Sequence, residues 1–151
     1  MNEAAVKIYT IGYQNITIED FCRILTENEI TAIADIRENP YSRNRDFSQK
    51  AIIAHLQKAG IAYFHFKALG SPPDLRREVR ENHDYKRFFE QYTNHLNTQS
   101  DTLAELNNII YDNTICLLCY EHDIAICHRR IVAEKLAELA EAAGPVEIIH
   151  L

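Results

Sequence analysis

Hydrophobic and polar positions along this chain fall into short blocks whose spacing switches between the two-residue period of strands and the longer period of helices. Runs rich in branched and aromatic side chains, bounded by turn residues, predict strands. Apolar residues three and four positions apart predict amphipathic helices between those runs. The predicted strands are residues 6–11, 30–36, 61–66, 114–120 and 146–151.

The predicted helices have recognisable ends. Serine, threonine and aspartate side chains favour helix starts because they accept hydrogen bonds from amides that lack a partner in the first turn. The expected N-caps are Thr17, Ser48, Asp84 and Ser100. Gly60 fits the position just beyond a helix end. The last helix is expected to start near Cys127 and to run to Ala143, before Gly144 and Pro145.

Strands that alternate with helices predict an α/β fold. We expect a single-domain three-layer sandwich with a mostly parallel sheet of about five strands and helices on both faces. Residues 1–6 are expected to be a short N-terminal tail, and residues 7–151 the domain. In such folds ligands bind beyond the carboxyl ends of the strands, where several polar residues of this sequence fall.

Charge is unevenly distributed along the chain. The whole sequence of 151 residues carries a net charge of −6, whereas residues 37–87 carry a net charge of +5. A basic middle in an acidic chain indicates a local anion-binding face rather than general affinity for nucleic acid. The sequence has no apolar run long enough for a membrane span and no signal peptide pattern, and its four cysteines suggest reduced thiols. We therefore expect a cytoplasmic protein with no membrane partner.

The segment from Asn113 to Arg130 holds the densest chemistry. Cys119 ends the predicted strand, Glu121 follows in a loop, and Cys127 stands at the predicted helix start. A helix N-terminus carries partial positive charge, so we expect it to lower the pKa of the Cys127 thiol. The candidate catalytic residues are Cys119, Glu121, Cys127, His128 and Arg129. The alternative is that the cysteines are small core residues and the arginines a solvated face.

A second set of residues has the chemistry to hold an anionic ligand. Arg37 follows the second predicted strand, and a polar loop with Ser42 and Arg43 comes after it. Guanidinium groups bind phosphate or carboxylate through paired hydrogen bonds. The candidate ligand-binding residues are Tyr13, Arg37, Ser42, Arg43, His65 and Lys67. Arg37 has an alternative structural interpretation, an ion pair with a nearby acid.

Three functional hypotheses follow. The first is a thiol-dependent enzyme or redox sensor for a phosphorylated or carboxylated ligand, with Cys127 as nucleophile and Cys119 as resolving thiol. The second is a nucleotide or nucleic-acid binding module without catalysis, in which Tyr13, Tyr41 or His65 stacks on a base. Ala125 occupies the position where a phosphatase-type Cys-x5-Arg loop after Cys119 needs arginine, so that chemistry is not assigned.

The third hypothesis is a metal site. Cysteine and histidine are suitable ligands, and the candidates are Cys116, Cys119, His122, Cys127 and His128. However, Cys116 and Cys119 are an odd number of residues apart on a strand and therefore point to opposite faces. We assign no metal ligands from the sequence, and it leaves the cofactor and the oligomeric state open.

The same residues resemble the uncharacterised bacterial family called domain of unknown function 488. The resemblance runs from Lys7 to Leu151, and it implies a compact α/β fold without implying a reaction. Its most specific part is Cys119-Tyr120-Glu121 followed by Cys127-His128-Arg129. Its other parts are Thr10 to Tyr13, Asp35 to Arg37, Pro40, Ser42-Arg43, Tyr63, His65, Leu69-Gly70 and Ile149-His150.

Overall fold

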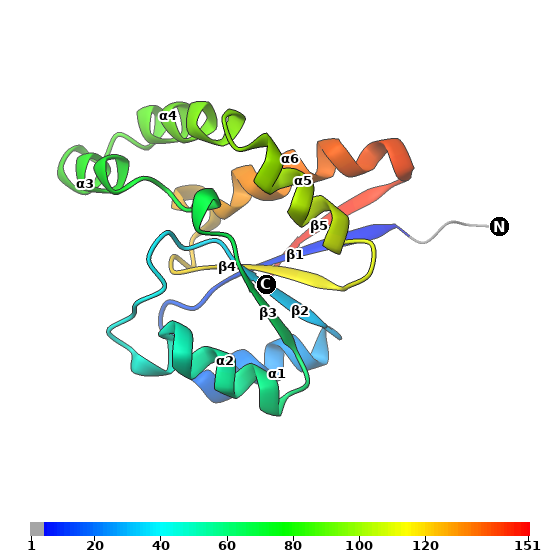
Figure 1. The fold of residues 1–151 in the computed structure, drawn as a ribbon. Coiled ribbons are helices and arrows are strands. Elements are labelled where there is room, and N and C mark those ends of the chain that lie inside the picture. Colours follow the sequence, from blue (N-terminus) through cyan, green and yellow to red (C-terminus); the bar gives the residue numbers. More distant parts are fainter. Residues whose placement is uncertain (1–4) are drawn as a thin grey trace.

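The computed structural model describes residues 5–151, and its centre is one five-stranded sheet. All strand pairs in the sheet are parallel, and the strand order is β3-β2-β4-β1-β5 (Figure 1). The strands are β1 (Val6–Gly12), β2 (Ala32–Asp35), β3 (Ala62–His65), β4 (Ile115–Cys119) and β5 (Val146–His150). The expected α/β sandwich is confirmed, with a sheet that is entirely parallel. Residues 1–4 of the expected tail lie outside the described residues, and Val6 already belongs to β1.

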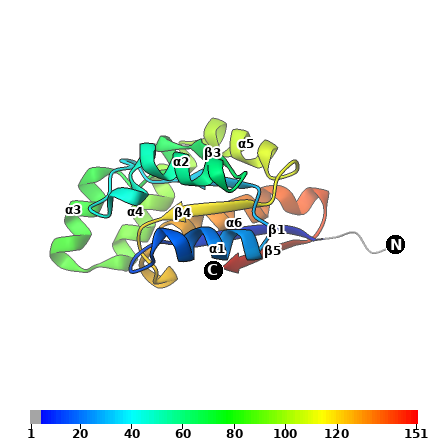
Figure 2. The same ribbon diagram turned by 90° about the horizontal axis from the view of Figure 1, so that it is seen from below.

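Helices cover both faces of the sheet, as expected. They are α1 (Ile18–Glu27), α2 (Gln49–Lys58), α3 (Pro73–Asn82), α4 (Tyr85–Asn97), α5 (Ser100–Ile109) and α6 (Arg129–Ala140). Figures 1 and 2 show α1 and α2 on one face and α5 and α6 on the other, while α3 and α4 extend beyond the strand ends. Single turns of 3-10 helix at residues 45–47, 67–69, 124–126 and 141–143 complete the connections.

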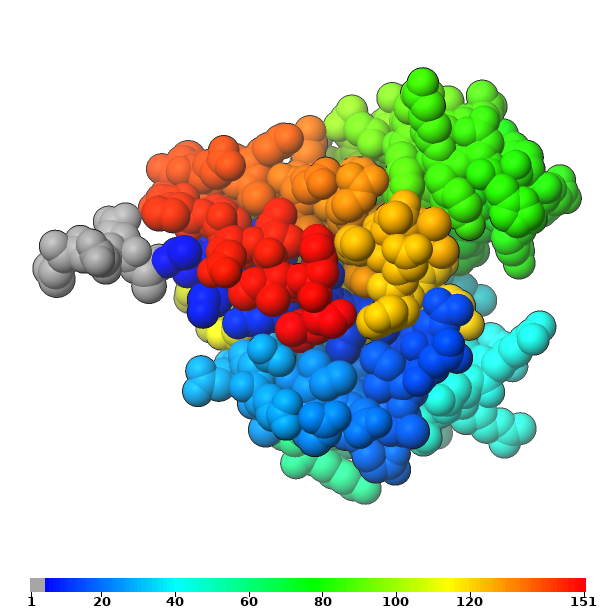
Figure 3. Space-filling model, turned by 180° about the vertical axis from the view of Figure 1, so that it is seen from behind, coloured from blue at the N-terminus to red at the C-terminus, as the bar shows by residue number. Residues whose placement is uncertain are grey.

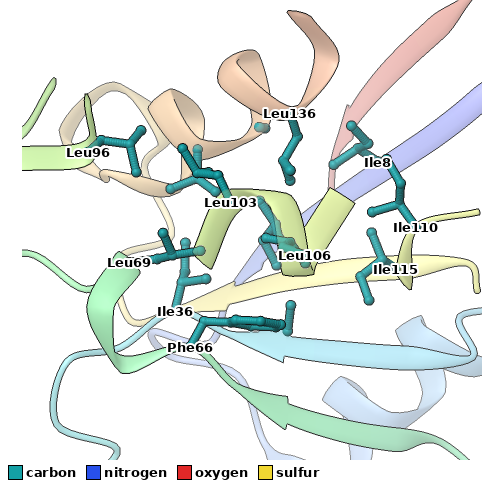
Figure 4. Packing of buried hydrophobic residues seen from close by; sticks show 14 of the residues in the cluster. Ile8, Ile36, Phe66, Leu69, Leu96, Leu103, Leu106, Ile110, Ile115 and Leu136 are labelled. Carbon is teal, nitrogen blue, oxygen red and sulfur yellow. The ribbon is translucent and has the colours of Figure 1, made fainter. Parts of the chain in front are cut away.

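Two hydrophobic cores hold the three layers together. Along β4, Ile115 and Leu117 pack with α5 and α6, whereas Cys116 and Leu118 pack with α1 and α2. This alternation follows from the two-residue period of a strand, and it explains why a central strand buried on both faces is apolar throughout. Figure 4 shows the first core, where Leu106 of α5 and Leu136 of α6 meet Ile8 and Ile115 of the sheet.

The predicted helix ends are largely confirmed. Thr17 Oγ1 accepts a hydrogen bond from the Asp20 amide, and the Asp84 side chain accepts one from the Arg87 amide. Ser48 is an N-cap by position, but its hydroxyl bonds to the backbone of Ser42 instead of the helix.

Two other predicted ends are wrong by a residue or a few. Gln99 is the N-cap of α5, so the helix already includes Ser100, and α6 ends at Ala140, where a 3-10 turn begins. Gly60 has a φ of 73°, as expected for a residue beyond a helix end.

The start of α6 also differs from the prediction. We expected residues 127–130 to open the helix, but α6 begins at Arg129 and His128 is its N-cap. A 3-10 turn over Ile124–Ile126, capped by Asp123, turns the chain back towards the sheet first. Cys127 therefore lies between the turn and the helix.

Candidate functional site

The carboxyl ends of four strands meet at one edge of the sheet. Gly12 of β1 pairs with Cys119 of β4, and Asp35 of β2 pairs with both Leu118 and His65. A parallel sheet places every strand end on the same side, so residues far apart in the sequence become neighbours. In Figure 3 the chain after β4, coloured yellow-orange, lies at the molecular surface between the red C-terminal strand and the blue turn after β1.

Two thiols and an imidazole come together at this edge. The Cys127 Sγ atom lies 2.9 Å from the Cys119 Sγ atom, and His128 Nδ1 lies 3.7 Å from Cys119 Sγ. All three side chains are buried, and their sulfur and nitrogen ligand atoms lie within 4.8 Å of one another. Both cysteines are free thiols. The structure therefore joins three of the five predicted catalytic residues in one cluster.

The orientation of His128 follows from its other nitrogen. Nε2 lies 2.9 Å from the backbone oxygen of Ile36, and a carbonyl oxygen only accepts hydrogen bonds. The Nε2 atom therefore carries the proton, and the lone pair of Nδ1 faces the thiols. Tyr92 of α4 packs edge-on against the same ring, with 5.1 Å between ring centroids.

Glu121 is the fourth predicted catalytic residue, and it lies next to the cluster. The Cys119 thiol donates a hydrogen bond to Glu121 Oε2 at 3.2 Å. Glu121 is half-buried, whereas Cys119 and Cys127 are almost wholly shielded from solvent. The carboxylate therefore stands between the thiols and the outside of the molecule.

Burial reverses the expected direction of the Cys127 pKa. We expected the helix N-terminus to lower this pKa, but removal of the thiol from water raises it well above its ordinary value, and the hydrogen bond with Cys119 raises it further. The pKa of His128 responds differently. Burial by itself lowers it, yet the hydrogen bonds to Cys127 and to the Ile36 carbonyl raise it overall.

Arg129, the fifth predicted catalytic residue, holds the loop after β4 in place. Its guanidinium is buried and donates hydrogen bonds to the backbone oxygens of Glu121 and His122 and to Thr10 Oγ1 at 3.2 Å. Thr10 also bonds His150 Nδ1 at 2.6 Å. The loop passes so close to β1 that a Cβ atom on Gly12 would lie 1.8 Å from the Glu121 oxygen. These contacts place Thr10 and Gly12 beside the candidate site, a position that the sequence did not assign to them.

Arg37 forms a second buried polar cluster. Its guanidinium makes two hydrogen bonds to Asp35, at 2.9 and 2.7 Å, and others to Tyr13 Oη and to the backbone oxygen of Phe47. The Tyr63 hydroxyl donates to the same Asp35 carboxylate at 2.5 Å. Burial opposes the charge of Arg37, but the ion pair raises its pKa overall, and burial together with Asp35 raises the pKa of Tyr63. In the structure Arg37 therefore forms an ion pair with Asp35, as the alternative interpretation of the sequence had it.

The other predicted ligand-binding residues divide between the interior and the surface. Tyr13 is buried and stacked on Phe47, with 4.4 Å between ring centroids. Ser42 is buried too, and His65 Nε2 lies 2.8 Å from the backbone oxygen of Arg37. Arg43 and Lys67 are exposed. These positions show that the six residues do not form one cluster, and their ligand-binding role stays a prediction.

Of the five candidate metal ligands, only Cys119, Cys127 and His128 come together among residues 5–151. Cys116 lies in the core between the sheet and α1 and α2, as the odd spacing predicted, and His122 is exposed.

The surface hollows of the molecule bear on the expected anion pocket. Two hollows lie against α3 and α4, one of them lined by Phe89, Thr93 and Asn94, and neither lies at the strand ends. The anion pocket expected at those ends therefore stays a prediction.

Within residues 5–151, none of the helices has the length and apolar character needed to cross a membrane.

A comparison with models of protein families confirms the resemblance to domain of unknown function 488. The model of the family described as "Domain of unknown function DUF488" matches residues 17–136. This range includes Arg37, Cys119 and Cys127, but not Thr10 to Tyr13 or Ile149-His150, so it is narrower than the resemblance suggested. Neither the curated proteins nor the solved structures that were compared include a match. Because the family model covers most of the sequence, the chain belongs to the DUF488 family.

Proposed function

We propose that Cys119 and Cys127 act as a redox-active dithiol that forms a reversible disulfide. The observation that carries this proposal is the 2.9 Å separation of the two sulfur atoms. A disulfide bond is about 2.05 Å long, so the sulfurs need to approach by roughly 0.9 Å. A movement of this size is within reach of small side-chain rotations, and the segment between the two residues is a loop and one 3-10 turn.

A peroxide is the oxidant class that balances the reaction. The Cys119 sulfur attacks one oxygen of hydrogen peroxide and becomes a sulfenic acid, and the O–O bond breaks so that the other oxygen leaves as water. The Cys127 sulfur then attacks the Cys119 sulfur, and the oxygen of the sulfenic acid leaves as water. Two thiols and one hydrogen peroxide give one disulfide and two waters, and two electrons pass from the sulfurs to the peroxide. A thiol reductant reverses the change by exchange.

The hydrogen bonds favour Cys119 as the first thiol to react. Its S–H group points to Glu121, which accepts the proton and is partly open to solvent. Cys127 donates a hydrogen bond to the Cys119 sulfur, and within residues 5–151 no carboxylate forms a hydrogen bond with the Cys127 thiol. The proposed order, with Cys119 as nucleophile and Cys127 as resolving thiol, is the reverse of the roles expected from the sequence.

Intact and fragment masses test this proposal. The reduced protein is treated with a small excess of hydrogen peroxide, remaining thiols are alkylated, and the chain is cleaved after glutamate. Cleavage after Glu121 separates Cys119 from Cys127, so a disulfide keeps the two fragments joined. The expected result is a loss of two hydrogens and one joined fragment pair, which dithiothreitol releases.

Matched variants complete the test. Cys116→Ser removes a buried thiol of the same strand that points to the opposite face, so the joined pair is expected to persist. Cys119→Ser and Cys127→Ser are each expected to abolish it. Overoxidation of single cysteines without a joined pair, or a disulfide that includes Cys22, contradicts the proposal.

A second candidate function is supported by the loop between β2 and α2. Tyr41 is 72% exposed, and Arg43 and Arg45 have no acidic partner within salt-bridge distance among residues 5–151. The loop is held in shape, because the Ser42 amide donates to Ser48 Oγ at 3.0 Å and the Gln49 amide to the Pro40 oxygen at 2.9 Å. Figure 3 shows this cyan segment projecting from the body. We infer that it binds a nucleotide or a short single strand through stacking and phosphate contacts.

Fluorescence anisotropy with a labelled single-stranded oligonucleotide tests this candidate. Arg43→Ala is expected to weaken binding uniformly across sequences and to reduce the salt slope by about one. Arg23→Ala is the control, because Arg23 is an exposed arginine on α1 that pairs with Glu27. Binding that does not depend on salt, or that responds equally to both variants, contradicts this function.

A further inference from the structure

The cluster of Cys119, Cys127 and His128 also has the composition of a metal centre. We propose that these three residues bind a zinc ion through Sγ, Sγ and Nδ1. Two thiolates and an imidazole are the ligands that favour zinc over harder divalent cations. The inference does not rest on the redox proposal, because zinc binding needs the sulfurs reduced but does not need them to form a disulfide.

Two separations between ligand atoms can be compared with those around a tetrahedral ion: Cys119 Sγ to His128 Nδ1, and Cys119 Sγ to Cys127 Sγ. Bonds of about 2.3 Å to sulfur and 2.0 Å to nitrogen place a sulfur about 3.5 Å from the nitrogen and two sulfurs about 3.8 Å apart. The separation of Cys119 Sγ from His128 Nδ1 is 3.7 Å, so these two atoms are already at about the distance that a shared zinc ion requires. The two sulfurs, now 2.9 Å apart, need to separate by about 0.9 Å to admit the ion.

The imidazole is already oriented as a ligand. A metal-bound histidine typically donates its second ring N–H to a backbone carbonyl, which fixes the ring and its tautomer. His128 Nε2 is bonded to the Ile36 oxygen at 2.9 Å, and this leaves the Nδ1 lone pair directed at the sulfurs. The Tyr92 ring packs against the same imidazole and restricts its rotation.

The surroundings also suit a site with three protein ligands. The Arg129 amide points at Cys127 Sγ at 3.5 Å, and an amide directed at a sulfur stabilises negative charge on it. Glu121 Oε2 lies 3.2 Å from Cys119 Sγ on the more open side. We assign the fourth position to this side, where a water held by Glu121 completes the coordination. Three protein ligands with an open fourth position are the usual arrangement of catalytic zinc.

Titration of the reduced protein with Co²⁺, followed by competition with Zn²⁺, tests the site. A 1:1 complex with intense thiolate-to-cobalt bands and the visible bands of tetrahedral Co²⁺ is expected, and Zn²⁺ is expected to remove them. Bound Zn²⁺ is further expected to protect Cys119 and Cys127 from alkylation, without changing the alkylation of Cys22. Both readouts use the unaltered chain, so they decide the matter even if a variant fails to fold.

Variants then identify the ligands. Cys119→Ser and Cys127→Ser are expected to weaken Zn²⁺ binding by more than ~100-fold, because loss of an outer-shell partner alone costs about 10–100-fold. Cys116→Ala and His122→Asn are the matched controls, since both residues are near in sequence but lie outside the cluster. Circular dichroism verifies the fold of each variant.

Three results overturn the inference. They are no 1:1 complex in the folded, reduced protein, a Co²⁺ spectrum without thiolate bands, and equal effects of the control and ligand variants. Zinc binding without peroxide-induced disulfide refutes only the redox proposal, and the opposite pattern refutes only the zinc site.

Discussion

Replacement of Gly12 by alanine tests the central geometry of the site. Gly12 is the last residue of β1, and the loop after β4 crosses it so closely that the added Cβ atom would lie 1.8 Å from the Glu121 oxygen. Real Cβ atoms almost never come within 3.0 Å of a heavy atom outside their own residue and its two chain neighbours. The Glu121 backbone therefore has to move by about 1.2 Å, and the same Cβ would lie 2.9 Å from Arg129 Nη1.

The expected cost can be worked out from these contacts. Overpacking in a filled interior costs about 1–3 kcal/mol. Displacement of the loop also strains the hydrogen bond from Arg129 to the Glu121 oxygen, and a hydrogen bond to a charged group contributes about 1.5–3 kcal/mol. Alanine is better than glycine in a strand by about 0.5–1 kcal/mol, which offsets a little of this. We expect Gly12→Ala to lower the free energy of unfolding by about 2–5 kcal/mol.

Urea denaturation followed by circular dichroism measures this change. Gly60→Ala is the matched control, because Gly60 has open space around it and only its positive φ penalises a side chain, at a cost of about 1–2 kcal/mol. Gly12→Ala is also expected to slow formation of the Cys119–Cys127 disulfide, because the shifted loop carries Glu121. A Gly12→Ala protein as stable as Gly60→Ala, with unchanged disulfide formation, would refute this account of the site.

Two other predictions concern charged side chains. Arg37→Met leaves the buried Asp35 carboxylate without its ion-pair partner and is expected to lower the free energy of unfolding by about 3–5 kcal/mol, measured by urea denaturation. The double variant Arg37→Met with Asp35→Leu is expected to recover part of that loss, and a double variant less stable than the single one would contradict this reasoning. Burial, with a smaller contribution from Glu19, raises the pKa of the Cys22 thiol. Glu19→Gln is therefore expected to shift the pH profile of Cys22 alkylation to lower pH, and an unchanged profile would exclude the charge effect.

The two proposals for Cys119 and Cys127 describe alternative states of the same sulfurs. A zinc ion holds them apart and reduced, whereas a disulfide leaves no sulfur lone pair arranged for the ion. Peroxide treatment of a zinc-loaded protein is therefore expected to release the metal as the disulfide forms. This relation links the two proposals without making either one depend on the other.

The arginines illustrate what local patterns do not reveal. Arg37 follows β2 and was expected to bind an anion, whereas Arg129 begins α6 and was expected to be a catalytic residue. In the structure both are buried and bonded to protein groups of their own chain: Asp35 and Phe47 for one, and the loop after β4 for the other. The partners of Arg129 include Thr10, which is 119 positions away in sequence. No short-range pattern contains such a pair.

The sequence by itself determined the strands, most of the helices and their layering, although it did not predict α3. Hydrophobic periodicity depends on which face of a strand or helix is buried, so it predicted five strands, helices on both faces and opposite directions for Cys116 and Cys119. It also placed the candidate site residues at the strand ends, because parallel strands have their carboxyl ends on one side of the sheet. Helix ends were predicted where a side chain bonds its own first turn, as Thr17 does.

Only the tertiary structure decided what those residues do to one another. The 2.9 Å contact of Cys119 with Cys127 depends on the 3-10 turn that brings the chain back, and the imidazole tautomer of His128 depends on the distant Ile36 carbonyl. The direction of the Cys127 pKa was likewise decided by burial, which outweighed the helix terminus. Solvent exclusion and contacts between distant segments are properties of the packed chain, and spacing along the sequence does not encode them locally.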